Sequence, residues 1–159
     1  MELRRFVILS ENKEWEPSVA FLIDLLSIVT LKSIILGCNN PEKKEAYEKE
    51  AREIMYSINK KFQGKEITLE EIDYGKLARG IQLNAFANRF IWENETKARE
   101  GGKEQNHLLP FTHSVNGLRM RSGNYILNQV GGRKDLNLDR LNEELCKSFG
   151  YDFGGLFDE

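Results

Sequence analysis

The chain has 159 residues, of which 40% are hydrophobic and 30% charged, and its formal net charge is −2. This length suits about one domain with a real core, and the composition excludes a disordered chain. Proteins that bind nucleic acid or a membrane surface usually carry a basic excess, so the balanced charge argues against both partners. The low proline count, three residues, and the long Glu/Lys-rich runs favour helices.

The first apolar stretch, residues 19–36, predicts a helix that has Pro17 in its first turn and stops at Gly37. Apolar side chains cover nearly its whole circumference, as in a helix at the centre of a bundle or in a subunit interface. We therefore expect a homo-oligomer. Asp24 and Lys32 lie inside the stretch, and each would cost about 2.5–3.5 kcal/mol near the centre of a bilayer. This predicts a soluble protein rather than a membrane-spanning one.

The cysteine and histidine content predicts a cytoplasmic protein without metal or cofactor. Cys38 and Cys146 fit no zinc spacing and cannot make a disulfide framework, so reduced thiols are expected. The apolar run at the N-terminus is too short for a signal peptide. The two histidines fall short of a metal signature, and no glycine-rich phosphate loop is present.

Two further helices are predicted in the middle of the chain. Pro41 opens the second helix, in which the apolar residues recur as a single stripe up to Gly64. The segment Thr68-Leu69-Glu70-Glu71 has the spacing of a capping box, in which the Thr hydroxyl and the Glu carboxylate each hold a free amide. It predicts the start of a third helix that runs to about Arg99.

The last third of the chain predicts one long and one short helix. Pro110 is the expected start of the fourth helix, which Gly131 and Gly132 would end. Asp139 could cap a last short helix up to Gly150. Residues 150–159 form an acidic aromatic tail, which would dock on its own domain or on a partner.

Together these elements predict an all-α protein, with residues 1–159 forming a single-domain bundle of about four to five helices. The N-terminal R-R-F-V-I-L-S and the K-E-I-T at residues 65–68 leave one alternative open, because they could pair as a short strand ribbon.

The third predicted helix carries a stripe of polar residues on its core-facing side. By the 3.6-residue period, Asn84, Asn88, Glu95 and Arg99 fall within about 60° of one another, and Trp92 lies beside the same stripe. Buried polar groups cost free energy unless they are paired. The stripe therefore predicts polar partners on another helix.

The first helix is the expected place for those partners, because Asp24 and Lys32 lie among its apolar residues. The Asp24 carboxylate itself needs a cation or donor there, for which Arg99 and Arg119 are the candidates. Two interpretations stay open. The polar side chains either form an internal network that fixes the register of the helices, or they line a pocket for a ligand.

The segment H-S-V-N-G-L-R adds candidates from the fourth helix. His113 and Asn116 lie toward one side of that helix, and Arg119 flanks its apolar face. Arginine offers a planar fork for phosphate, and histidine can donate to phosphate or move a proton near neutral pH. The segment is consistent with an anion site.

Three stretches, D24-L-L-S-I-V-T-L-K, N88-R-F-I-W-E-N-E-T-K-A-R and H113-S-V-N-G-L-R, resemble a group of short, mainly helical, uncharacterised proteins of phages and bacteria. The resemblance spans roughly residues 20–130. It implies a helical fold and a phage setting, but no activity.

We therefore expect a protein that binds, and by binding sequesters, a small anionic ligand such as a nucleotide or a sugar phosphate. The expected ligand-binding residues are Lys32, Asn84, Asn88, Trp92, Arg99, His113, Asn116 and Arg119, and Asp24 and Glu95 are expected to support them. One alternative is a hydrolase or transferase of a phosphorylated compound with Glu95 or His113 as general base. The other is a structural or protein-interaction oligomer without a ligand.

Overall fold

The computed structural model describes residues 16–64, 67–100 and 105–134, together with Phe157. In this part of the chain the protein is all-α, as predicted, and no strand occurs. The four α-helices are α1 (Val19–Gly37), α2 (Pro41–Gln63), α3 (Tyr74–Glu100) and α4 (Gln105–Val130). The N-terminal half of the alternative strand ribbon and the last helix expected up to Gly150 lie outside the described residues. In the other half of the ribbon, Ile67 and Thr68 are described and form no strand.

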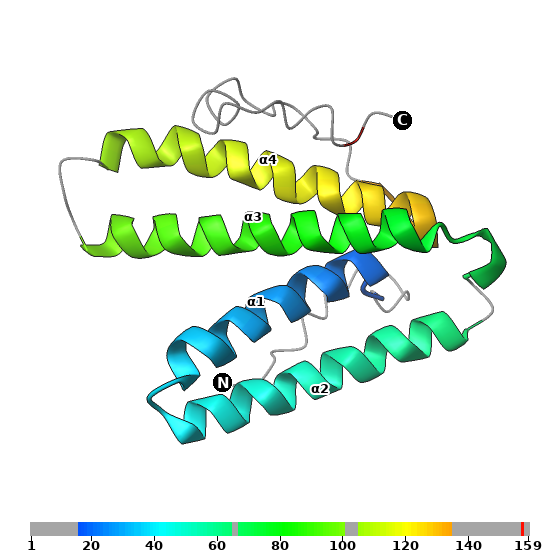
Figure 1. Cartoon of the computed structure of the whole chain (residues 1–159), viewed down its shortest axis with the longest axis horizontal. Coiled ribbons are helices and arrows are strands. Elements are labelled where there is room, and N and C mark those ends of the chain that lie inside the picture. Colours follow the sequence, from blue (N-terminus) through cyan, green and yellow to red (C-terminus); the bar gives the residue numbers. More distant parts are fainter. Residues whose placement is uncertain (1–15, 65–66, 101–104, 135–156, 158–159) are drawn as a thin grey trace, which may run out of the picture.

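The helices form two antiparallel pairs, α1 with α2 and α3 with α4 (Figure 1). The helix α1 lies between the pairs and packs against each of the other three helices. It starts close to α3 and runs in the same direction, but at an angle, so the two helices diverge toward their C-terminal ends (Figure 1). This divergence decides which polar residues of α3 are covered.

Three apolar clusters hold the bundle together. One joins α1 to the start of α3 and the end of α4, a second lies between α1 and α2, and a third lies between α3 and α4. The first is the largest, and its buried members are Val19, Ala20, Ile23, Ile72, Leu77, Ile126, Leu127 and Val130. All four helices therefore contribute to one bundle.

Side-chain caps explain where the first two helices begin. The Ser18 hydroxyl accepts a hydrogen bond from the backbone N–H of Phe21 at 3.2 Å. The side-chain oxygen of Asn40 accepts one from the backbone N–H of Lys43 at 3.0 Å. Such caps satisfy backbone donors that have no partner in the first helical turn. With Pro41 directly after the second cap, the predicted start of α2 is confirmed. Pro17, which was expected in the first turn of α1, instead lies just before the Ser18 cap, because the Ser18 side chain supplies the acceptor for the first turn.

The predicted start of the third helix is wrong. Thr68 makes no side-chain capping bond and precedes only a single 3-10 turn, Leu69–Glu71. After the buried residue Ile72, Asp73 accepts a hydrogen bond from the backbone N–H of Lys76 at 3.0 Å, and α3 begins there. A carboxylate is a strong N-cap acceptor, and it also favours the positive end of the helix dipole.

The fourth helix ends as predicted but begins earlier. It starts at Gln105, five residues before Pro110. A proline in the second turn removes one helical hydrogen bond, which the many contacts of a long packed helix can outweigh. At the other end, Gly131 has a φ of 79° and its N–H donates to the carbonyl of Leu127 at 2.9 Å.

The first helix is long and apolar enough to cross a membrane, judged by length and composition alone. The core helix of a soluble protein meets the same criterion, so a single such helix is weak evidence for a membrane span. In this bundle 33% of that apolar stretch of α1 is buried, and Phe21 and Ile34 are 45% and 64% exposed.

A candidate site at the polar network of α1, α3 and α4

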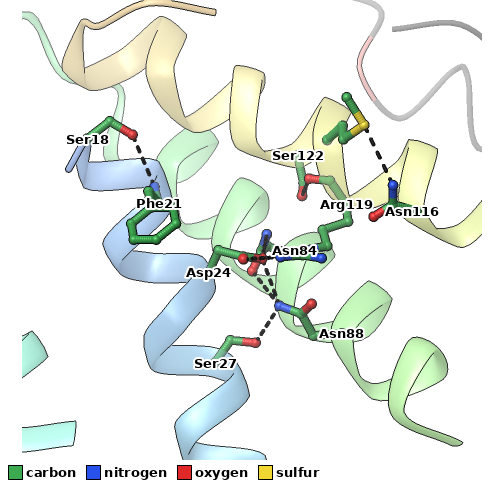
Figure 2. Close-up of polar contacts among 10 residues, drawn as sticks. Ser18, Phe21, Asp24, Ser27, Asn84, Asn88, Asn116, Arg119 and Ser122 are labelled. Atoms are coloured by element: carbon green, nitrogen blue, oxygen red, sulfur yellow. Dashed lines mark hydrogen bonds and ion pairs between the residues drawn. The ribbon is translucent and has the colours of Figure 1, made fainter. Parts of the chain in front are cut away.

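A carboxylate on α1 lies at the centre of a polar network between three helices (Figure 2). The Asp24 carboxylate accepts hydrogen bonds from Arg119 through Nε at 2.8 Å and Nη2 at 2.5 Å, one to each oxygen. Asn84 and Asn88 donate to the same carboxylate at 3.1 and 3.0 Å. Arg119 thus presents the side of its planar fork to the carboxylate, which is the strong geometry for this pair.

Helical spacing brings these side chains together. Asp24 and Ser27 are three residues apart on α1, and Asn84 and Asn88 are four apart on α3, so each pair shares one face of its helix. Asn88 also approaches the Ser27 hydroxyl at 2.9 Å and the Asn84 side-chain oxygen at 3.1 Å. Because an ionised carboxylate only accepts hydrogen bonds, both amides must turn their nitrogens toward Asp24.

Burial makes the network costly to break. Asn84 and Asn88 are 1% and 3% exposed. The side chains of Asp24 and Arg119 are 15% and 33% exposed, so the ion pair is largely removed from water. A group buried in this way costs free energy unless it is paired, and here each of the four side chains has at least one partner.

The same contacts shift the pKa of both charged groups. Burial alone would raise the pKa of the Asp24 carboxyl, but the hydrogen bonds from Arg119 and the two asparagines, with the charge of Arg119, hold it below its ordinary value of 3.8. The hydrogen bond to Asp24 raises the pKa of Arg119 above its ordinary value despite burial. Both groups are therefore charged at neutral pH.

The lowered pKa of Asp24 predicts an acid-dependent loss of stability. A carboxyl with a lower pKa in the folded than in the unfolded state stabilises the fold above its unfolded pKa and loses that contribution as pH falls through the folded value. We expect urea denaturation to show a loss below pH 3.8 that is smaller in Asp24→Asn. Equal acid sensitivity in both proteins would contradict this assignment.

Two residues of the predicted polar stripe lie outside the network. Glu95 and Arg99 are exposed and form an i,i+4 ion pair with each other at 3.4 Å, where core-facing positions had been expected. The helical wheel placed them correctly relative to Asn84 and Asn88. The difference arises because α1 diverges from α3 before reaching them (Figure 1).

The remaining predicted residues are dispersed. Lys32 lies 6.0 Å from the centre of the Tyr47 ring, in the α1–α2 pair. Asn116 points its amide toward the sulfur of Met120 at 3.8 Å, and Trp92 is half-buried on α3. His113 lies on α4, but its side chain is not among the described ones. As ligand-binding residues, all of them stay predictions.

The sequence analysis did not predict that Ser27 belongs to the polar network. Its position three residues after Asp24, on the same face of α1, was an available signal. It also missed a second polar contact, between the buried Ser33 of α1 and Glu48 of α2, which hydrogen-bond directly. These serines pack against neighbouring helices while providing hydrogen-bond partners.

A hollow of about 330 Å³ lies on another part of α3, lined by Arg79, Gln82, Leu83 and Phe86. By helical position these residues face away from Asn84 and Asn88, so the hollow and the network are separate. No group of three or more metal-ligating side chains occurs in the described part of the chain.

The chain matches no protein-family model, no curated protein and no solved structure.

Proposed function

We propose that the protein is a helical interaction module that associates with a second copy of itself through the α1–α3 wedge. This name denotes the side chains that, by helical spacing, continue the faces of Asp24 on α1 and Asn88 on α3 toward the C-terminal ends of these helices, namely Leu31, Ile34, Ile35, Trp92, Glu95 and Arg99. The observation that carries the proposal is the 64% exposure of Ile34.

The wedge continues a face of α1 that is packed into the bundle nearer the N-terminus of this helix. Asp24 and Ser27 point from this face into the bundle. Leu31 and Ile34 follow Ser27 by four and seven residues, so they extend the same face by one and two turns. Apolar side chains on a core-forming face that the four described helices leave uncovered are typical of an interface.

The charges of the wedge suit a symmetric partner. In a two-fold symmetric dimer the same patch of both copies forms the interface. If one residue of the first copy contacts a second residue of the other copy, the reverse contact also forms. Glu95 and Arg99 have opposite charges one turn apart at the exposed end of the stripe. An antiparallel approach of two copies would set Glu95 of one against Arg99 of the other.

A charged residue in the wedge should abolish assembly. We expect wild-type protein to be a dimer in native mass spectrometry and sedimentation, and Ile34→Glu to raise the dissociation constant by about a hundredfold or more, because a glutamate would be buried without a partner. Tyr56→Glu is the matched control, since Tyr56 is 70% exposed on α2 outside the wedge. It should leave the dimer intact.

Circular dichroism of Ile34→Glu must show unchanged helix content, so that dissociation is not a result of unfolding. A wild-type monomer at tens of micromolar, a usual concentration range for such weak assemblies, would refute self-association. Wild-type protein that instead floats with phosphatidylcholine vesicles would assign the wedge to a lipid surface.

A second candidate function is binding of a small anionic ligand in the hollow of α3. Its volume of about 330 Å³ lies at the lower end for small-molecule sites. Arg79 offers a guanidinium to a phosphate, and Phe86, 38% exposed, offers a ring face to a base or sugar. Such a protein would sequester a nucleotide or sugar phosphate in the cytoplasm, a compartment that suits the free, exposed Cys38.

The same native mass spectra distinguish the two functions. A ligand retained from the cell would appear as added mass that Arg79→Ala removes and Ile34→Glu does not. Turnover by Glu95 or His113 stays a prediction without a supporting contact, because Glu95 is exposed and paired with Arg99.

A further inference from the structure

The two helix pairs are joined at one end of the molecule. The first apolar cluster takes its buried residues from the starts of α1 and α3 and from the end of α4, so it lies where these three ends meet (Figure 1). The second and third clusters lie within the α1–α2 pair and the α3–α4 pair. Phe157 of the predicted tail packs against the third cluster, and the rest of that tail lies outside the described residues. Each pair therefore has an apolar core of its own, as units that move or open as one body do.

The polar network is the next contact between the pairs along α1. Asp24 directly follows Ile23, the last α1 residue of the first cluster. Its partners Asn88 and Arg119 belong to the other pair. Beyond the network, no apolar cluster of the described residues joins the pairs, α1 and α3 diverge, and Ile34 is 64% exposed (Figure 1). The contacts between the pairs thus run from an apolar end through a polar middle to an open end.

Apolar and polar contacts respond differently when two surfaces separate. An apolar cluster loses free energy in proportion to the area that it exposes to water. Hydrogen bonds between polar groups are instead replaced by hydrogen bonds to water, so their net contribution is small. The buried Asp24 carboxylate also gains hydration when the surfaces separate, and in the closed arrangement Arg119 offsets the loss of that hydration. Opening at the network is therefore less costly than opening at the first cluster.

We propose that the two helix pairs form a hinge, in which the first apolar cluster is the pivot and the ion pair of Asp24 and Arg119 is the latch. Release of the latch turns the α1–α2 pair away from the α3–α4 pair as one body and widens the space between α1 and α3. The latch thereby regulates how much of α1 a partner can reach. The hinge is a property of a single copy, so it does not require self-association through the α1–α3 wedge.

The distance between two spin labels across the open end tests the hinge in the full chain. Cys38 is exposed at the end of α1, and Lys97 is exposed near the end of α3. Lys97→Cys with Cys146→Ser leaves one label site on each helix pair, and an excess of unlabelled protein removes distances between copies. We expect Arg119→Ala to shift the distance measured by electron paramagnetic resonance to longer values and to broaden it, because opening hydrates the unpaired Asp24 carboxylate.

A pair of labels within the α1–α2 pair is the matched control. Lys60 is exposed on α2, so Lys60→Cys replaces Lys97→Cys while the label on Cys38 stays. The distance between these labels should be the same with and without Arg119→Ala, because the α1–α2 pair moves as one body. A longer or broader distance here would show that the pair itself comes apart, and would overturn the hinge.

A double variant distinguishes release of the latch from loss of packing. Asp24→Leu with Arg119→Met removes both charges but keeps the space filled with apolar side chains. The distance across the open end should therefore stay as short and as narrow as in wild type. An unchanged distance in Arg119→Ala, or an equal increase in the double variant, would contradict the proposal.

Discussion

Replacing Arg119 with alanine is expected to lower the free energy of unfolding by about 2–4 kcal/mol, because it leaves the buried Asp24 carboxylate without its cation. The two asparagines would remain as donors, but neutral amides compensate a buried charge less well than a guanidinium does. Urea denaturation at pH 7 measures the loss. The range is below that of a fully buried pair because Arg119 is 33% exposed.

Two controls show whether pairing or burial causes the loss. Arg89→Ala removes an exposed i,i+4 pair with Glu93 on the same bundle and should cost less than about 0.5 kcal/mol. The double variant Asp24→Leu with Arg119→Met should unfold within about 1 kcal/mol of wild type, since hydrophobic replacement of a buried pair is often neutral. If the double variant were as unstable as Arg119→Ala, the network would contribute more than charge compensation.

A valine at Gly80 should be the other strongly destabilising change, at a cost of about 3 kcal/mol. A Cβ atom at this position would lie 2.8 Å from Cγ1 of Ile126 and 3.3 Å from Cδ1 of Tyr125. Ile126 is fully buried, so it cannot move aside without disturbing the first apolar cluster. Thermal unfolding of Gly80→Val measures the effect.

Gly123→Val provides the matched control on α4. Nothing lies within 4 Å of a Cβ atom built at Gly123, so the substitution should be neutral or slightly stabilising, by up to about 0.5 kcal/mol, because glycine is a poor helix former. A small effect at both positions would show that α3 and α4 can separate at Gly80. The close approach of the two helices would then be unnecessary for stability.

The sequence limited the cation that pairs with Asp24 to two candidates but could not decide between them. A carboxylate amid apolar residues of α1 had to find a cation, and Arg99 and Arg119 were the two candidates. Local periodicity could not decide between them, because it describes one helix at a time. The choice depends on the angle at which α1 crosses α3, and that angle is set by apolar packing across all four helices.

Helix boundaries were predictable where a single cap was available and not where two competed. Asn40 and Pro41 left no alternative for the start of α2. For α3, Thr68 and Asp73 were both suitable caps, and the buried position of Ile72 between them favours the later start. For α4, Pro110 gave a predicted start that is five residues too late, because proline occurs in the first turn of a helix more often than in the second. These are cases of tertiary contacts overriding local preference.

The position of Arg119 also has a consequence for the order in which the protein is made. Asp24 leaves the ribosome 95 residues before its cation, a delay of about 5–20 s at usual rates of synthesis. During that time the apolar α1 has only α2, and then α3, to cover it. An unpaired aspartate within this segment makes insertion into a membrane less favourable, by up to the value of about 2.5–3.5 kcal/mol that applies at the centre of a spanning helix. The residue that later joins three helices thus first lowers the tendency of this apolar segment to enter a membrane.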